Sequence, residues 1–139
     1  MGEFKINQAS LDDLDVLALM NKQLIEDEQH DNPMDVEALK IRMKEFLLGE
    51  YRAYLFKQEE VIKGYALVNY VRKPAYLRQF FLCRDSRGSG LGKACFQLLL
   101  KELKVEQLDV EVMYWNETGY KFWKSLGFEE RSVYLRLEN

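Results

Sequence analysis

The sequence has little cysteine, proline and histidine. Its 139 residues include two cysteines, Cys83 and Cys95, which do not form a CxxC motif and have no histidine cluster beside them. A disulfide framework or a zinc site is therefore not indicated, and we expect reduced thiols and no bound metal. Two prolines and 47% hydrophobic residues also argue against a disordered chain.

The sequence also lacks a long apolar run and an excess of positive charge. No stretch approaches the roughly 18 apolar residues of a membrane span, and the first residues do not resemble a signal peptide. Lys and Arg number 20 and Asp and Glu 23, so the formal net charge is −3 and nucleic-acid binding gains no support. We expect a cytoplasmic protein with no membrane or nucleic-acid partner.

The length suits one domain that spans residues 1–139. Apolar periodicity predicts strands near residues 4–8, 52–58, 61–71, 76–83, 108–112 and 133–137. It predicts helices after Ser10, from Pro33 to Gly49, from Leu91 to about Lys104 and after Asn116. This order indicates a single α+β or α/β layered fold with a mixed sheet.

A glycine-rich loop, Arg87-Gly-Ser-Gly-Leu-Gly-Lys93, lies between a predicted central strand and a predicted helix. Unpaired amides and the helix dipole favour phosphate at such a place. A P-loop would need glycine at position 87 and Ser or Thr at position 94, where this chain has Arg87 and Ala94. A dinucleotide fingerprint fails in spacing and in its place along the chain.

What remains, Arg87-x-x-Gly90-x-Gly92, resembles the Arg/Gln-x-x-Gly-x-Gly/Ala signature of the GNAT superfamily of acyl-CoA-dependent N-acyltransferases. Leu82, five residues before Arg87, resembles the hydrophobic residue at the end of the family's central strand. A second segment, from Asn116 to Phe128, resembles the family's Asn-x-x-Ala-x-x-Phe-Tyr-x-x-Leu-Gly-Phe pattern. The clear match covers about residues 76–128.

This resemblance implies a mixed, mostly antiparallel sheet of six to seven strands flanked by about four helices. The sheet would splay between the strand ending near Cys83 and the strand near Leu108 to Met113. The implied function is the transfer of acetyl from acetyl-CoA, without a metal, to a primary amine of a small molecule by direct attack in a ternary complex. A protein or peptide amine as acceptor, and a non-catalytic acyl-CoA-binding sensor, stay open as alternatives, and the protein would be a monomer or homodimer.

The resemblance also implies which residues contact the coenzyme. The glycine loop would hold the pyrophosphate, and strand-edge groups would hold the pantetheine arm. Asn116 would cap a helix and contact the same arm. The predicted coenzyme-binding residues are Leu82, Cys83, Arg87, Gly88, Ser89, Gly90, Leu91, Gly92, Lys93, Asn116 and Trp123.

The proton donor to the leaving thiolate is not settled by the resemblance. The family's usual acid is a tyrosine, and the matching position here is Trp123, whose indole N–H is not an acid at neutral pH. Tyr120, one helical turn earlier, and Tyr114 could reach the thiolate instead, and water is a further alternative. Of these we assign Tyr120 as the candidate acid.

The acceptor would lie near a cluster of ionisable residues and near the central strand. The segment that holds Glu26, Asp27, Glu28 and His30 stands where the family binds substrate, and Glu28 is a candidate base or substrate contact. Arg78 and Gln79 are further candidates for substrate binding, of which one is expected to face the cleft. An arginine would suit an amine that bears a carboxylate, whereas the acidic residues would suit a cationic one, and the sequence does not choose.

Overall fold

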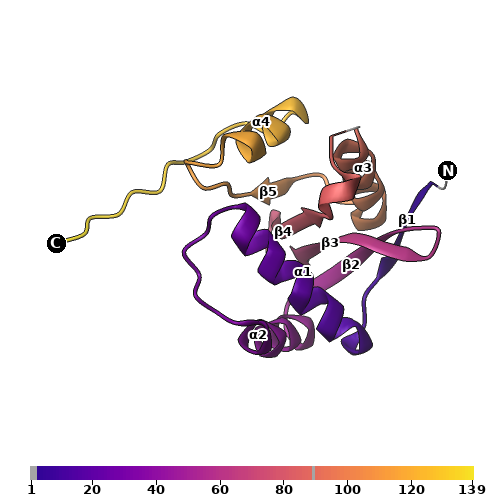
Figure 1. The fold of residues 1–139 in the computed structure, drawn as a ribbon. Coiled ribbons are helices and arrows are strands. Elements are labelled where there is room, and N and C mark those ends of the chain that lie inside the picture. The colour runs from indigo at the N-terminus through magenta and orange to yellow at the C-terminus, as the bar shows by residue number, and fades with distance from the viewer. Residues whose placement is uncertain (1–2, 89) are drawn as a thin grey trace.

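The fold is a five-stranded sheet with helices on both faces, seen in a computed structural model that describes residues 3–88 and 90–139 (Figure 1). The strands are β1 (Phe4–Gln8), β2 (Tyr51–Gln58), β3 (Val61–Asn69), β4 (Ala75–Leu82) and β5 (Leu108–Val110), in this spatial order. The helices of the described residues are α1 (Leu14–Asp27), α2 (Val36–Leu48), α3 (Leu91–Leu103) and α4 (Glu117–Ser125), with 3-10 turns at Leu11–Asp13 and Arg84–Ser86.

Local signals of the sequence account for most of these boundaries. Ser10 and Asp13 form a capping box at the start of the helix predicted after Ser10, although the first turn is a 3-10 turn rather than α-helix. Glu59 and Glu60 lie between the two predicted strands, and both adopt positive φ in the turn from β2 to β3. The second helix starts later than the predicted Pro33, because the side chain of Asp35 accepts a hydrogen bond from the Ala38 amide and caps it there.

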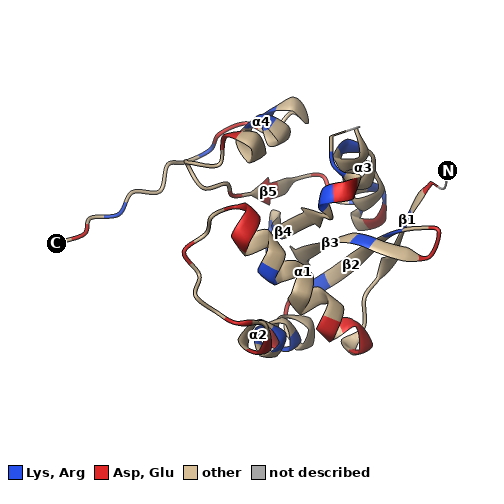
Figure 2. Cartoon of the chain, viewed as in Figure 1, with Lys and Arg blue, Asp and Glu red and all other residues tan. Residues whose placement is uncertain are grey.

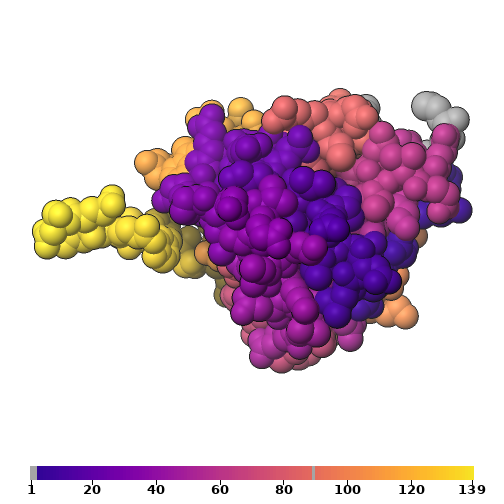
Figure 3. Space-filling model, turned by 60° about the horizontal axis from the view of Figure 1, so that its bottom comes forward, coloured from indigo at the N-terminus to yellow at the C-terminus, as the bar shows by residue number. Residues whose placement is uncertain are grey.

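The predicted strand at residues 133–137 is wrong. No strand follows α4 among the described residues, and Val133, Leu135 and Leu137 are 82%, 86% and 87% exposed. The tail formed by residues 129–139 extends away from the body of the molecule (Figures 1 and 3). The sheet therefore has five strands instead of the expected six to seven, because an alternating pattern forms a strand only where a sheet edge pairs with it.

The sheet is mostly antiparallel, as the sequence predicted. Strands β1 to β4 pair antiparallel in chain order, and only β4 and β5 run parallel. The ladder between β4 and β5 covers three residues on each strand, Ala75 to Leu77 and Leu108 to Val110. Beyond Leu77 the two strands separate, which confirms the expected splay.

A β-bulge at Arg78 divides β4 into two halves. The register with β3 pairs Leu67 with Gln79 but Val68 with Leu77, so Arg78 is an extra residue without a partner. Because side chains alternate along a strand, one extra residue exchanges the two faces. Phe81 accordingly packs on the α1 side, whereas Leu77, four residues earlier, packs on the α3 side.

Two apolar clusters lie on opposite faces of the sheet. The cluster under α1 and α2 includes Leu17, Met43 and Tyr65, all fully buried. The cluster under α3 and α4 includes Phe56 and Leu99, which are also fully buried. Burial of both sheet faces fixes the direction in which β4 and the glycine loop leave the sheet.

Charged residues of both signs are spread over helices, strands and loops in the view of Figure 2. Acidic residues lie at both ends of α1 in this view. Over residues 3–88 and 90–139, no helix has the length and apolar character needed to cross a membrane.

Candidate active site

The separation of β4 from β5 opens a fork in the sheet. The half of β4 from Arg78 to Leu82 has β3 on one side and no strand on the other. Successive amides of a strand point to alternate sides. The Cys83 amide donates to the Lys63 carbonyl on the β3 side, at 2.7 Å. The Leu82 amide therefore points the opposite way, into the fork, where a strand partner would otherwise be.

The glycine loop lies at the end of β4 and leads directly into α3. Gly88 and Gly90 have φ of 88° and 78°, values that L side chains rarely adopt, so glycine is needed at both positions. Gly90 is the N-cap of α3 and makes no side-chain capping hydrogen bond. The amides of the first turn of a helix have no acceptor within the helix and can bind an anion. Ser89, also predicted to contact the coenzyme, lies outside the described residues.

The Arg87 side chain turns back from the loop toward the end of α1. Its Nε donates to the Leu82 carbonyl at 2.8 Å, and its Nη2 donates to Asp27 Oδ2 at 2.5 Å. Arg84 donates to the other oxygen of Asp27 at 2.6 Å. Burial opposes ionisation of Asp27, but the two arginines outweigh it and lower the pKa of the carboxyl. Arg87 thus braces the loop through its side chain, a role that the sequence pattern did not indicate.

Helix α4 closes the other side of the glycine loop. The Asn116 side chain accepts a hydrogen bond from the Gly119 amide at 2.9 Å, which confirms that Asn116 caps this helix. A Cβ on Gly92 would lie 3.1 Å from the Phe122 ring, so the absence of a side chain lets α3 approach α4 closely. Trp123 makes edge-to-face contacts with four aromatic rings, those of Phe80, Phe96, Phe122 and Phe128.

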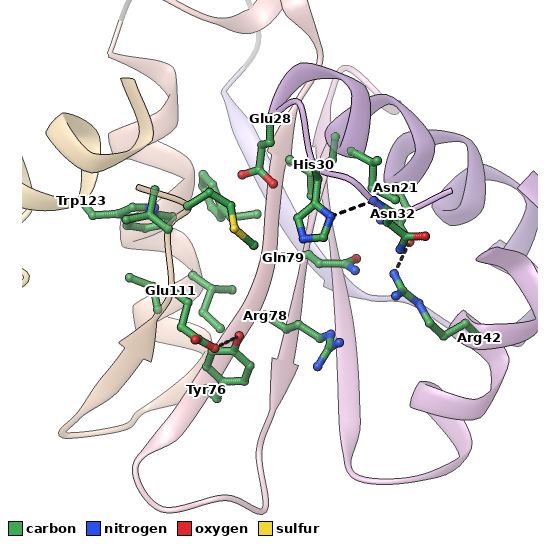
Figure 4. A pocket seen from close by; sticks show the side chains of 17 residues that line it. Asn21, Glu28, His30, Asn32, Arg42, Tyr76, Arg78, Gln79, Glu111 and Trp123 are labelled. Atoms are coloured by element: carbon green, nitrogen blue, oxygen red, sulfur yellow. Dashed lines mark hydrogen bonds between the residues drawn. The ribbon is translucent and has the colours of Figure 1, made fainter. Parts of the chain in front are cut away.

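A cleft of about 320 Å³ adjoins the fork. Elements from both halves of the chain line it: the end of α1, α2, the bulged part of β4 and the segment that follows β5 (Figure 4). The lining residues are Asn21, Leu24, Ile25, Glu28, His30, Asn32, Arg42, Tyr76, Leu77, Arg78, Gln79, Phe80, Val110, Glu111, Val112, Met113 and Trp123. The cleft therefore brings together Glu28, His30, Arg78, Gln79 and Trp123 from the sequence-based set.

Glu28 and His30 enter the cleft from the end of α1 and the loop after it (Figure 4). Burial, with a smaller contribution from Asp27, raises the pKa of the Glu28 carboxyl above its usual range. The Trp115 indole donates to the Glu28 carbonyl at 3.0 Å and ties α1 to the segment before α4. His30 Nδ1 accepts a hydrogen bond from the Asn32 amide at 3.1 Å. Because this nitrogen is an acceptor, it does not donate a hydrogen bond to Asp31, whose Oδ1 lies 3.4 Å from it.

The bulge places both Arg78 and Gln79 at the cleft, whereas strand alternation predicted one of them. Gln79 is buried and accepts a hydrogen bond from the Tyr65 hydroxyl at 2.7 Å. Arg78 is exposed, and its Nη1 donates to the Tyr51 hydroxyl at 3.4 Å. Both side chains face the cleft because the extra residue interrupts the regular alternation.

Five polar residues of the cleft were missed from the sequence: Asn21, Asn32, Arg42, Tyr76 and Glu111. Asn21 and Arg42 lie on the helices that cover the sheet, and Arg42 Nη2 donates to Asn21 Oδ1 at 3.3 Å. Tyr76 donates to Glu111 at 2.7 Å across the start of the fork. A polar residue among the apolar positions of α1, as Asn21 is, could have signalled the first pair.

Other predicted residues lie outside the cleft lining. Asp27 is held by its two arginines, and Glu26 is exposed. The Tyr120 hydroxyl donates to Glu130 at 2.6 Å. This hydrogen bond, and to a lesser extent burial, raises the pKa of Tyr120. The position of Tyr120 therefore lends no support to its predicted contact with the thiolate, and its role as acid stays a prediction.

The two thiols are free, with Cys83 half-buried and Cys95 buried. Burial raises the pKa of each thiol, to about 12 for Cys95, so both are protonated at neutral pH and poorly suited as nucleophiles. Within the described part of the chain, no three His, Cys, Asp or Glu side chains are grouped so that they could hold a metal ion.

Comparisons with known proteins agree with this geometry. The sequence from residue 16 to residue 128 matches the Acetyltransferase (GNAT) family. No curated protein sequence matches the chain. A predicted acetyltransferase from Clostridium acetobutylicum, solved with acetyl-CoA, is 18% identical with a TM-score of 0.72, over 98% of this chain and 96% of that one.

Two further solved structures share the fold. PaiA N-acetyltransferase from Thermoplasma acidophilum, in complex with coenzyme A, is 14% identical with a TM-score of 0.79, over 94% of this chain and 92% of that one. Ribosomal-protein-alanine N-acetyltransferase from Brucella melitensis biovar Abortus 2308 is 15% identical with a TM-score of 0.71, over 97% of this chain and 100% of that one. The family match and the forked sheet with its glycine loop together show that the chain belongs to the GNAT family of acetyltransferases, enzymes that use acetyl-CoA to acylate an amine.

Proposed function

We propose that the protein transfers acetyl from acetyl-CoA to the primary amine of a small molecule by direct attack in a ternary complex. This proposal rests on one observation: the fork in the sheet lies between the glycine loop, where the coenzyme would bind, and the cleft, where the acceptor would bind. The glycine loop and the uncapped start of α3 lie at the end of β4, and the cleft of about 320 Å³ lies beside the bulge of the same strand. This volume is at the lower end of the range for small-molecule sites.

The residues of the loop suit the coenzyme. The amides of Leu91, Gly92 and Lys93 are the first of α3 and are suited to the pyrophosphate. The Leu82 amide, which points into the fork, is suited to the thioester oxygen as charge develops on it. Asn116, at the start of α4, remains a candidate contact of the pantetheine arm.

The reaction exchanges one bond for another. The carbon–sulfur bond of the thioester breaks and a carbon–nitrogen bond to the amine forms, with the acetyl group going directly to the acceptor. The amine loses a proton, for which Glu28 in the cleft is the candidate base because its raised pKa lies nearer neutrality than that of an ordinary carboxyl. The thiolate gains a proton, for which Tyr120 is the candidate donor from the sequence; because its hydroxyl donates to Glu130 outside the cleft lining, water is the donor that the geometry favours.

A non-catalytic acyl-CoA sensor is the second candidate, and the aromatic packing of Trp123 at the position of the usual acid favours it. Two measurements separate the candidates. Saturating coenzyme A or acetyl-CoA should raise the melting temperature in both cases, by the equivalent of about 2.7 kcal/mol at 100 times Kd. Only an enzyme releases free thiol from acetyl-CoA with a panel of small amines and peptides, and binding without release for every amine would favour the sensor.

A further inference from the structure

Two guanidinium groups converge on the side of the cleft that faces α2. Arg42 comes from α2 and Arg78 from the bulge of β4 (Figure 4). Both pack over the ring of Phe46, with their central carbons 5.3 Å and 4.9 Å from its centroid. The two positive charges are therefore held near each other, and burial, followed by the charge of Arg78, lowers the pKa of Arg42.

The two arginines lack an anionic partner. Among the described residues, no carboxylate lies within 4.0 Å of either guanidinium, although six other Lys or Arg side chains form such ion pairs with Asp or Glu. Arg42 donates to the neutral Asn21 side chain and Arg78 to the neutral Tyr51 hydroxyl. Nε of Arg42 is buried and has no hydrogen-bond partner. A buried donor without a partner costs about 1–3 kcal/mol.

The two carboxyl groups of the cleft lie away from the arginines. Glu28 enters from the end of α1, on the far side of His30 from Arg42 (Figure 4). Glu111, from the segment after β5, is occupied by the Tyr76 hydroxyl. The cleft is thus polarised, with a carboxyl group near the fork, where an amine must attack, and two guanidiniums near α2.

We propose that the acceptor is an amine that also carries a carboxylate, as amino acids do, with the carboxylate bound by Arg42 and Arg78 and the amine directed toward Glu28 and the fork. This assignment rests on the proposed function. A guanidinium presents paired N–H donors that match the two oxygens of a carboxylate. The bound carboxylate orients the acceptor, so that its neutral amine faces the thioester carbon.

The test compares each amine with and without a free carboxylate, with rates calculated per neutral amine because esterification also lowers the pKa of the amine. The probes are α-amino acids and ω-aminocarboxylic acids of two to six carbons, each beside its methyl ester, with acetyl-CoA held at saturation and thiol release as the signal. We expect kcat/KM for the free acids to exceed that for the esters by about ten-fold or more, since a charge-assisted hydrogen bond contributes about 1.5–3 kcal/mol. Equal or faster turnover of the esters would overturn the proposal and leave the acetyltransferase function intact.

Two arginine variants distinguish a specific carboxylate contact of Arg78 from a general effect of removing a positive charge. Arg78→Gln replaces an exposed side chain, so the fold should persist, and we expect a rise in KM for the acids of at least about ten-fold with little change for the esters. Arg52→Gln is the matched control, because Arg52 is also exposed and stacks on an aromatic ring, that of Tyr70. If Arg78→Gln changed acids and esters alike, the carboxylate contact would be refuted.

A binding measurement makes the test independent of turnover. In the presence of coenzyme A, the acids should raise the melting temperature of the protein further than their esters do, and Arg78→Gln should abolish this difference. No difference between acids and esters would count against the proposal. Failure of coenzyme A itself to stabilise the protein would instead refute the proposed function.

A second, independent observation concerns the tail at residues 129–139. Its apolar side chains alternate, which suits one face of a strand, yet Val133, Leu135 and Leu137 are exposed by more than four-fifths. The edge of the sheet at β5 offers unpaired backbone groups. The tail nevertheless leaves the body of its own chain instead of pairing there (Figure 3).

We infer that the tail pairs with the β5 edge of a second copy of the chain, so that two copies exchange tails in a symmetric dimer. The outer edge of β5 and the tail each lack a strand neighbour among the described residues, so each can supply the backbone partner that the other lacks. Such an exchange buries the alternating apolar residues and pairs both edges at once. It also braces residues 111–113, which line the acceptor cleft.

Light scattering and hydrogen exchange of the full chain test this exchange. We expect twice the 16.5 kDa mass of one chain, with protected amides at residues 108–112 and 131–137 that lose protection on dilution. Leu135→Asp should give a folded monomer, since Leu135 is 86% exposed and has little burial to lose within its own chain, whereas Leu48→Asp, at another exposed leucine, should remain dimeric. A monomeric full chain, or a Leu135→Asp dimer, would overturn the inference.

Discussion

The side chain of Arg87 joins the glycine loop to Asp27 at the end of α1, with 2.5 Å between Nη2 and Oδ2. Asp27 is only 12% exposed, whereas the side chains of Arg84 and Arg87 are 67% and 40% exposed. The pair of contacts therefore links the coenzyme loop to the helix that lines the acceptor cleft. Solvent screens the arginines, so the link contributes modestly to stability.

Asp27→Asn should lower the free energy of unfolding by about 1 kcal/mol at pH 7. The folded-state pKa of Asp27 lies below its ordinary value of 3.8, so its contribution is present above that value and disappears as the pH falls through the folded-state pKa. Urea unfolding at pH 7 and near pH 3 measures the difference. Asp31→Asn, at a side chain that is 84% exposed, is the control, and an equal loss in both variants would contradict the role of the arginines.

Gly90→Ala should weaken coenzyme A binding by about ten-fold, equivalent to about 1.4 kcal/mol. Alanine at a φ of 78° is strained, so the loop must change shape and its amides move. Gly127→Ala is the matched control, because Gly127 also has positive φ, of 101°, and also faces open space, but lies after α4. Titration calorimetry should show normal affinity for the control, although both variants should lose about 1 kcal/mol of stability.

Glu28→Gln should reduce kcat/KM by about a hundred-fold, in the range of general-base catalysis, and remove the acidic limb of the pH profile. Because burial raises the pKa of Glu28 in the folded state, the folded protein loses stability as the pH rises from 4.5 through that raised pKa. The variant should therefore melt no lower than the parent at pH 7. Glu26→Gln, at an exposed neighbour, should leave both properties unchanged.

A loss of both activity and thermal stability in Glu28→Gln would indicate a structural role for Glu28 instead of a catalytic one. Retained turnover with an unaltered pH profile would show that water or another group accepts the proton of the amine.

Tyr120→Phe should change kcat by less than about two-fold, because the hydroxyl donates to Glu130 and lies outside the cleft lining. Trp123→Phe should likewise retain turnover while losing stability by about 1–3 kcal/mol, since it removes part of an aromatic cluster. Steady-state kinetics with acetyl-CoA and a carboxylate-bearing amine measure both. A drop of more than ten-fold in kcat for Tyr120→Phe alone would establish Tyr120 as the proton donor.

Local chemistry made much of the fold predictable. The alternation in β1, the turn at Glu59 and Glu60 and the glycine loop before α3 are each encoded within a few residues. The bulge at Arg78 could not be read in this way, because an extra residue in a strand has no signature until its partner strand and both cores are known.

The coenzyme loop was more predictable than the acceptor cleft for a related reason. The loop is contiguous and its glycines are needed by its own backbone. Arg42 comes from α2, where an arginine looks like part of a solvated face, and only the packing of α2 beside α1 carries it to β4. The tail was misjudged because alternation describes a side-chain pattern and does not supply the neighbouring strand.

The bulge gives β4 one residue, Arg78, that contributes to the acceptor cleft without contributing to the apolar core. Since Arg78 lies opposite no residue of β3 and belongs to neither core cluster, its side chain can be exchanged at little cost to the fold. The adjoining residues, Leu77 and Gln79, are buried and have no such freedom. Position 78 is thus a point where acceptor preference can diverge between related chains while the strand, the fork and the coenzyme loop that follows it keep their shape.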